Sequence, residues 1–165
     1  MGRETLAKYR RVSRLLHAVT LAATLFLVAA YAIAMLAGSG FAVVEGSSME
    51  PLLHSGDLVI LSSSGDYGPG DIVVYRKGDR YIIHRIIYEY RGSGGIECYV
   101  IKGDNNPIPD TGDPALCGSV RVEGIGYAIG VPETAIVGKA VEWRGIVLKI
   151  PYVGILKIVS DEYFS

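Results

Sequence analysis

An uncharged stretch near the N-terminus places the strongest constraint on the fold of this 165-residue chain. Residues 18–37, AVTLAATLFLVAAYAIAMLA, include no charged residue, no glycine and no proline. A helix of about 20 apolar residues is long enough to span the hydrocarbon core of a bilayer. A helix buried in a soluble core would keep a polar stripe, and this stretch shows little of one. The sequence therefore predicts a transmembrane anchor over residues 15–38.

A cleaved signal peptide is the competing interpretation of the same stretch. The segment AMLAGSG, residues 34–40, offers small residues of the kind found at cleavage sites. The apolar region of a signal peptide has only about 7–15 residues, however, and the run here is longer. Its length favours a retained anchor.

Basic residues before the apolar stretch indicate its orientation. Residues 1–14 form a basic segment in which Glu4 is the single acid. The basic residues are Arg3, Lys8, Arg10, Arg11 and Arg14. Positive flanks stay on the cytoplasmic side of a membrane. We therefore expect a single-pass protein of the cell membrane, with a cytoplasmic N-terminus and an extracytoplasmic remainder.

The remainder alternates short apolar segments with turn residues, which predicts a mainly β, barrel-like domain over residues 39–145. Lys77-Gly78-Asp79 is typical of a hairpin turn, and residues 105–114 are too rich in Pro, Asn and Asp for regular structure. The expected strands cover residues 41–45, 56–61, 71–76, 80–90 and 96–104, with further strands within 122–143.

The last segment, residues 146–165, is apolar again but contains Lys149, Pro151 and Lys157. Its apolar stretch YVGILKIVS, residues 152–160, is too short to cross a bilayer. It can pack on the core or lie in the membrane interface with its lysines reaching toward water, and we favour the interface.

Composition and motifs exclude several classes of function. The formal net charge of −1 offers no basic surface for nucleic acid. The sequence contains no metal motif, phosphate loop or cofactor fingerprint, so we expect no metal and no cofactor. Cys98 and Cys117 lie in the part expected outside, where disulfides persist, but the spacing alone leaves a disulfide and two separate thiols equally open.

Ser48, in GSSMEP, is a candidate nucleophile that needs a neighbouring base to take its proton. The chain has three histidines. His17 lies at the cytoplasmic edge of the apolar stretch, and His54 lies in a turn. His84 lies within a predicted strand, where a histidine is more often a hydrogen-bonded core residue than a catalyst. An acid should orient the base, and the loop KGDNNPIPD offers two that could equally serve as turn residues.

Four segments in a fixed order resemble the sequence blocks of type I signal peptidases, specifically the archaeal and endoplasmic-reticulum branch. They are GSSMEP, GDIVVYR, HRI and KGDNNPIPD. In that branch a Ser–His pair replaces the bacterial Ser–Lys pair. The resemblance implies a β-rich catalytic domain with its active site near the membrane surface. It implies a membrane-bound serine endopeptidase that removes signal peptides from secretory preproteins by cutting after small residues at −1 and −3. The need for accessory subunits stays open.

The resemblance also implies roles for individual residues. It assigns Ser48 as the nucleophile, His84 as the general base and Asp110 as the acid that orients His84. Asp104 would support the site, and we expect its carboxylate to brace the loop through backbone N–H groups.

Oxyanion and substrate contacts are assigned in the same way to Ser47, Ser48 and Met49. Many relatives have a serine two positions before the nucleophile, where its hydroxyl helps to bind the oxyanion. Here Gly46 occupies that position and a serine stands at Ser47. The loss of one such donor costs about 10²–10³ in rate, so Ser47 or another amide has to compensate.

Two alternatives remain at this stage. One is a specialised processing protease of the same superfamily with a lysine base, for which Lys77 and Lys102 are the nearby lysines. The other is an inactive membrane-anchored β-domain that binds signal peptides or partner subunits, an interpretation that Gly46 leaves open.

Overall fold

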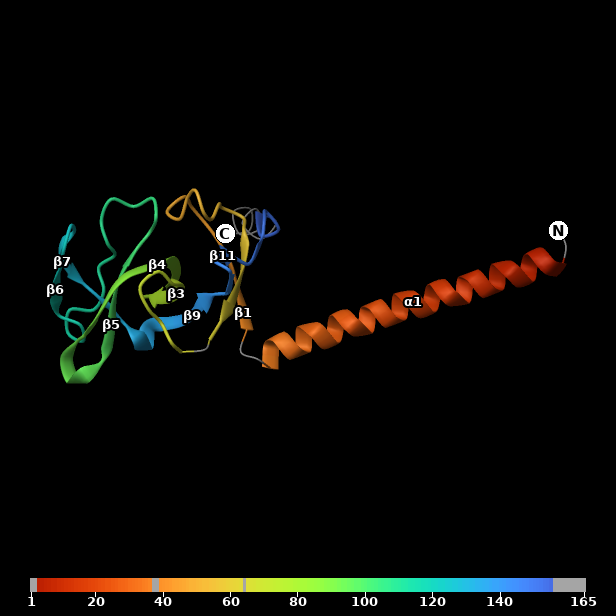
Figure 1. Ribbon diagram of the computed structural model, residues 1–165, viewed down its shortest axis with the longest axis horizontal. Coiled ribbons are helices and arrows are strands. Elements are labelled where there is room, and N and C mark those ends of the chain that lie inside the picture. Colours follow the sequence, from red (N-terminus) through yellow and green to blue (C-terminus); the bar gives the residue numbers. More distant parts are fainter. Residues whose placement is uncertain (1–2, 37–38, 64, 156–165) are drawn as a thin grey trace. The chain divides into compact units, whose positions relative to one another are not determined.

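The computed structural model describes residues 3–36, 39–63 and 65–155. The chain divides into two compact units, Met1–Gly38 and Ser39–Ser165. The first is the single helix α1 (Arg3–Leu36) (Figure 1). Within it, Arg10–Ala29 is long and apolar enough to cross a membrane, and that window is not buried. The predicted apolar helix is therefore confirmed, while its insertion in a membrane stays a prediction.

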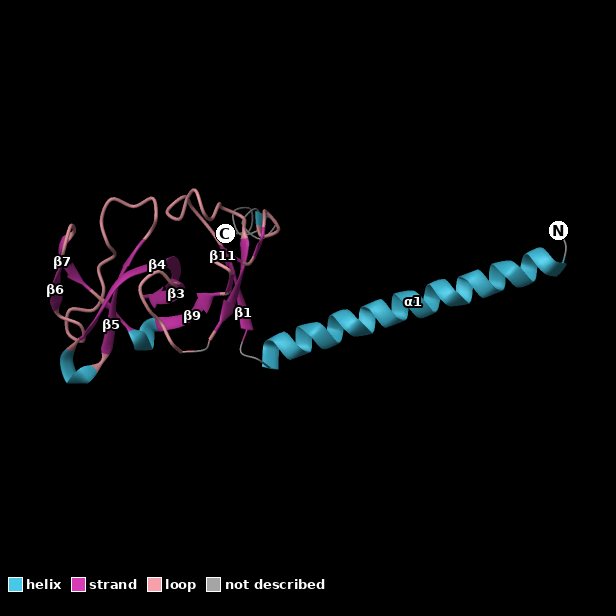
Figure 2. Ribbon diagram, in the orientation of Figure 1, coloured by secondary structure: helices cyan, strands magenta, loops and turns pink. Residues whose placement is uncertain are grey.

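The second unit is mainly β, which confirms the predicted fold class (Figure 2). Five strands lie where they were expected: β1 (Ser39–Val43), β2 (Leu58–Ser62), β3 (Ile72–Lys77), β4 (Arg80–Arg91) and β5 (Glu97–Lys102). The later elements are β6 (Ser119–Val122), β7 (Gly126–Ile129), β8 (Val131–Pro132), β9 (Ile136–Ala140), β10 (Glu142–Trp143), β11 (Ile146–Val147) and β12 (Lys149–Ile150). Two short 3-10 helices are η1 (Ser93–Gly95) and η2 (Glu133–Ala135).

Eight strands form one antiparallel sheet. Its main path runs β1-β2-β9-β3-β4-β5-β8, and β12 pairs with β2. The hairpins β6-β7 and β10-β11 form separate two-stranded sheets. Among the strands of the described ranges, no pairing joins β1 to β8, so the sheet is not closed into a barrel.

Strand β3 is buried on both faces and forms the centre of the domain. Its first four residues are all buried, and successive side chains of a strand point to opposite faces. Ile72 and Val74 therefore belong to one hydrophobic cluster, and Val73 and Tyr75 to another. The second cluster consists of Val73, Tyr75, Ile86, Tyr99, Ile101 and Val131. This double burial is typical of a central strand.

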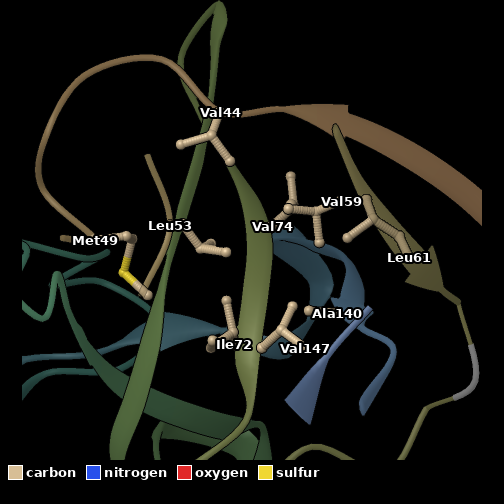
Figure 3. Close-up of a cluster of buried hydrophobic side chains, with 9 residues drawn as sticks. All are labelled: Val44, Met49, Leu53, Val59, Leu61, Ile72, Val74, Ala140 and Val147. Carbon is tan, nitrogen blue, oxygen red and sulfur yellow. The ribbon is translucent and has the colours of Figure 1, made fainter. Parts of the chain in front are cut away.

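The first cluster anchors the loop of residues 44–57, which carries Ser48 (Figure 3). It consists of Val44, Met49, Leu53, Val59, Leu61, Ile72, Val74, Ala140 and Val147. Met49 and Leu53 are 1% and 0% exposed. Fully burying such side chains contributes about 1.5–3 kcal/mol each, so this loop is held to the sheet by its own apolar residues.

A disulfide joins Cys98 of β5 to Cys117 in the loop before β6. Their Cα atoms lie 5.8 Å apart, within the range that a disulfide needs. The structure thus decides in favour of the pairing that the sequence left open.

The C-terminal segment begins on the domain. β12 pairs with β2, and the N–H of Gly154 donates a hydrogen bond to the carbonyl of Gly56 at 2.8 Å. Ile150, Tyr152 and Val153 are nevertheless about half exposed. Residues 156–165 lie outside the described residues, so the interfacial location of this segment stays a prediction.

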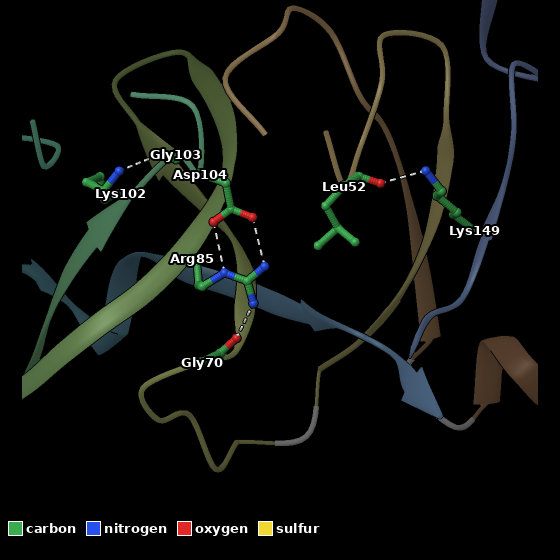
Figure 4. A network of polar contacts seen from close by, with 7 residues as sticks. All are labelled: Leu52, Gly70, Arg85, Lys102, Gly103, Asp104 and Lys149. Atoms are coloured by element: carbon green, nitrogen blue, oxygen red, sulfur yellow. Dashed lines mark hydrogen bonds and ion pairs between the residues drawn. The ribbon is translucent and has the colours of Figure 1, made fainter. Parts of the chain in front are cut away.

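A buried ion pair ties the same segment to the Ser48 loop. Asp57 is 1% exposed, and its carboxylate lies 2.6 Å from Nζ of Lys149. Nζ also donates to the carbonyl of Leu52 at 2.7 Å (Figure 4). Burial by itself would raise the pKa of Asp57, but hydrogen bonds from Lys149 and from the His54 backbone, with the charge of Lys149, lower it overall.

Replacement of Lys149 with methionine should therefore destabilise the domain. It leaves the Asp57 carboxylate buried without its cation, and breaking such a pair costs about 3 kcal/mol. Because the folded pKa of Asp57 lies below its ordinary value of 3.8, the pair stabilises the fold above that pH and its contribution is lost as pH falls through the folded pKa. Urea unfolding at several pH values would measure this loss.

Lys139→Met is the matched control. Lys139 pairs with Asp71 at 3.1 Å, but both side chains are about 30% exposed, so a smaller loss is expected. Equal losses in the two variants would contradict a special role for the buried pair.

Candidate active site

Three side chains from separate parts of the chain converge in the β domain. Nε2 of His84 lies 2.8 Å from Oγ of Ser48, and Nδ1 of His84 lies 2.5 Å from Oδ2 of Asp110. Ser48 comes from the loop after β1, His84 from β4, and Asp110 from the loop after β5. The structure thus brings together three of the residues that the sequence singled out.

The register of β4 directs His84 toward the interior. His84 pairs with Val73 of β3, and it is only 6% exposed. If the Ser48 hydroxyl donates to Nε2, then Nδ1 carries the ring proton and donates to the Asp110 carboxylate. This tautomer leaves Nε2 free to accept the serine proton, as a general base must.

The main chain on both sides of Asp110 is held by the sheet. The N–H of Asp110 donates to the carbonyl of Ile101 at 2.8 Å, and that of Gly112 donates to Ile129 at 2.9 Å. The Asp110 side chain is 14% exposed. Its carboxylate is therefore largely shielded from water where it meets the imidazole.

Asn105 holds the main chain at Ser48, a contact that sequence reasoning missed. Its N–H donates to the carbonyl of Ser48 at 2.8 Å, and its side-chain amide donates to the carbonyl of Ser47 at 3.1 Å. The loops approach closely at Gly103, where an added Cβ would lie 2.7 Å from the Ser48 oxygen. The only sequence signal for this contact is the GDNN segment itself.

Asp104 supports the loop through a side chain rather than through backbone N–H groups, which corrects the expected contact (Figure 4). Arg85 donates from Nε and Nη2 to the two carboxylate oxygens of Asp104, at 2.9 and 2.8 Å. Its Nη1 donates to the carbonyl of Gly70 at 2.8 Å. The hydrogen bonds that Arg85 donates to Asp104 are the main reason that the pKa of Arg85 is raised. Asp104 thereby ties its loop to β4.

The other candidate bases are engaged elsewhere or lie at the surface. Nζ of Lys102 donates to the carbonyls of Gly103 and Asn106, at 2.9 and 2.7 Å. Lys77 is exposed at the end of β3. The main chain of His54 forms a turn with Asp57. Among the hydrogen bonds of the described residues, only His84 meets the Ser48 hydroxyl.

A cleft of about 710 Å³ opens beside Ser48. It is lined by Ala42, Val43, Glu45, Gly46, Ser48, Val74, Arg80, Tyr81, Ile82 and Ile83. Most of these side chains are apolar, and the charged ones come from Glu45 and Arg80. The cleft thus lies between the end of β1 with the following loop and the start of β4.

The structure describes the backbone and the burial of the predicted oxyanion region. Gly46 has a φ of 89°, a left-handed conformation that strains any residue with a side chain, so a serine would not be well accommodated there. The side chain of Met49 is 1% exposed within the first cluster, which leaves only its main chain for contact with a substrate. Ser47 is exposed beside Ser48.

Comparison with known proteins agrees with the family suggested by the sequence. Residues 28–106 match the Peptidase S24-like family. The human signal peptidase complex catalytic subunit SEC11C is 33% identical over 129 residues, covering 76% of this chain and 59% of that protein. The signal peptidase complex catalytic subunit SEC11 of Schizophyllum commune is 31% identical over 144 residues, covering 76% of this chain and 66% of that protein. This chain is a homologue of signal peptidase catalytic subunits.

The matches cover only part of SEC11C and part of this chain. The chain spans about three fifths of the length of SEC11C. The Peptidase S24-like match contains Ser48, His84 and Asp104 but ends before Asp110. Support for Asp110 therefore comes from its contact with His84 rather than from the matched segment.

Asn105→Ala should loosen the main chain around Ser48. The variant loses the side-chain hydrogen bond to Ser47, and one such bond contributes about 0.5–1.5 kcal/mol, so amide hydrogen exchange at residues 46–50 should become about fivefold faster. Asn106→Ala is the control, since the hydrogen bonds described for Asn106 use its main chain. Unchanged hydrogen exchange in Asn105→Ala would contradict the proposal that Asn105 restrains the main chain at Ser48.

Proposed function

We propose that this chain is a membrane-anchored serine endopeptidase that removes signal peptides from secretory preproteins. The observation that carries the proposal is the hydrogen-bonded series Ser48–His84–Asp110 beside the cleft that Ser48 lines. The names of its relatives support it, because they are catalytic subunits of the signal peptidase complex.

In the proposed reaction, His84 takes the proton of Ser48 as Oγ attacks the scissile carbonyl carbon. The Asp110 carboxylate stabilises the imidazolium that forms. His84 then gives this proton to the leaving amine, which frees the mature protein and leaves the signal peptide as an ester on Ser48. A water molecule, activated by His84 in the same way, hydrolyses the ester. We assign the N–H of Ser48 as one hydrogen-bond donor to the oxyanion and Ser47 as the second donor.

The cleft suits an extended peptide with small side chains. β1 is the last strand on the path of the main sheet, and an extended substrate can add to such an edge through main-chain hydrogen bonds. We place the residues at −1 and −3 against the apolar side chains that β1 and β4 contribute to the cleft.

The proposed location is the cell membrane. Helix α1 would serve as the anchor, with residues 1–14 in the cytoplasm and the β domain outside, according to the distribution of basic residues. The Cys98–Cys117 disulfide supports an oxidising compartment. Because the relatives are subunits of a complex, we include accessory subunits among the proposed partners, together with preproteins and membrane lipid.

Cleavage of a preprotein by the full-length chain in lipid vesicles tests the proposal. Ser48→Ala and His84→Ala should each lower the rate by about 10⁴ or more, because each removes a member of a unit that acts together. His54→Ala is the matched control and should keep its activity, since His54 contacts Asp57 rather than Ser48. Product masses would locate the cleavage site.

Other outcomes would favour the alternatives. A folded wild-type chain that binds the signal peptide without cleaving it would indicate an inactive binding domain. Loss of activity in Lys102→Ala but not in His84→Ala would indicate a lysine base.

The two aspartates provide a second test. Asp110→Asn should lower kcat by about 10⁴, because an amide stabilises the wrong imidazole tautomer, and the melting temperature should change little. Asp104→Asn should be milder in rate and should lower the melting temperature, because it weakens the pair with Arg85. An inactive but fully stable Asp104→Asn together with an active Asp110→Asn would exchange these roles.

A further inference from the structure

Tyr75 carries a buried hydroxyl that the proposed mechanism does not use. The residue is 1% exposed, at the centre of the second cluster. Its hydroxyl oxygen is buried and, within the described residues, forms no hydrogen bond of normal distance and angle. A buried hydroxyl without a partner costs about 1–3 kcal/mol, and a phenylalanine would fill the same space without that cost. The hydroxyl therefore needs an explanation.

The strand register places Tyr75 beside the candidate site. Tyr75 pairs with Ile82 of β4, two residues before His84, and Val73 pairs with His84 itself. Because side chains two positions apart share a face, the Tyr75 ring lies on the same face of the hairpin as His84. That face also meets the Asp110 loop, which is bound to Ile101 of the same cluster.

The Asp110 carboxylate is the charged group that acts on the Tyr75 hydroxyl. Burial is the largest reason that the pKa of Tyr75 is raised, and the Asp110 carboxylate raises it further through its charge and its proximity as an acceptor. The described contact of Asp110 with His84 uses Oδ2, so Oδ1 can accept a second hydrogen bond.

The main chain of the Asp110 loop is restrained by hydrogen bonds to Ile101 and Ile129. The inferred hydrogen bond therefore requires a change in the side-chain torsions of Asp110 rather than a movement of the loop.

We infer that Tyr75 is a positioning residue whose hydroxyl donates a hydrogen bond to Oδ1 of Asp110 and holds the carboxylate in line with His84. The series then has four members: Ser48, His84, Asp110 and Tyr75. The phenol contacts neither the substrate nor the reacting atoms. It acts only through the orientation and hydrogen bonding of Asp110.

Tyr75→Phe tests this inference, which rests on the proposed peptidase function. We expect kcat/KM to fall about tenfold, as for the loss of one hydrogen bond to a charged group. The acid limb of the pH–rate profile should move to higher pH, because a carboxylate without this donor holds the imidazolium proton more tightly. Tyr99→Phe is the control, because Tyr99 is a buried tyrosine of the same cluster. Burial is the main reason that the pKa of Tyr99 is raised, and the charges that raise it further belong to Glu133, Glu97 and Glu89 rather than to Asp110.

A double-mutant cycle separates positioning from packing. If Tyr75 acts through Asp110, Tyr75→Phe should cost little further activity in an Asp110→Asn background. A tenfold loss in both backgrounds, or no kinetic change in Tyr75→Phe alone, would overturn the inference.

An NMR spectrum of the His84 ring requires no substrate and distinguishes this inference from the peptidase proposal. Tyr75→Phe should shift the resonance of the Nδ1 proton that faces Asp110, because the carboxylate loses a hydrogen bond, and Tyr99→Phe should not shift it. If Tyr75→Phe shows this change but the wild-type chain cleaves no preprotein, only the proposed function is contradicted. The absence of any difference would contradict the role of Tyr75 even in an active peptidase.

Discussion

The pairing register of β3 with β4 is the constraint on which the candidate site depends. Val73 pairs with His84, and β3 is buried on both faces. A slip of one residue would turn His84 to the opposite face and direct Arg85 into the second cluster. Because a buried, unpaired guanidinium is costly, the same hydrophobic core that stabilises the domain also enforces the orientation of the candidate base.

The remaining site residues lie on loops, and specific contacts restrain those loops to the sheet. Burial of Met49 and Leu53 holds the loop of residues 44–57 to the sheet. The ion pair between Asp57 and Lys149 restrains the C-terminal end of the same loop. The other loop meets it at Ser48, whose carbonyl accepts a hydrogen bond from Asn105. Precise placement of a nucleophile thus follows from contacts on both sides of Ser48 rather than from rigidity of the loop itself.

Local patterns in the sequence were sufficient for the apolar helix, the first five strands and the hairpin at Gly78, since each depends on neighbouring residues. The insertion of β9 between β2 and β3 depends on long-range pairing, which short apolar segments of similar composition do not specify. For the same reason the Cys98–Cys117 pairing stayed open until the Cα separation was known. The resemblance to a family supplied Ser48, His84 and Asp110, but it did not indicate Arg85 as the partner of Asp104 or the burial of the Tyr75 hydroxyl.

The alternation of side chains along β4 separates two acids that lie six positions apart in one loop. His84 points inward to Asp110, and its neighbour Arg85 points to the other face, where it binds both oxygens of Asp104. The two acids of this loop therefore have different partners: Asp110 contacts the imidazole, and Asp104 binds a guanidinium that also donates to the carbonyl of Gly70. One loop is thus fixed to neighbouring residues of β4 on opposite faces, and the Asp110 carboxylate is the one that meets His84.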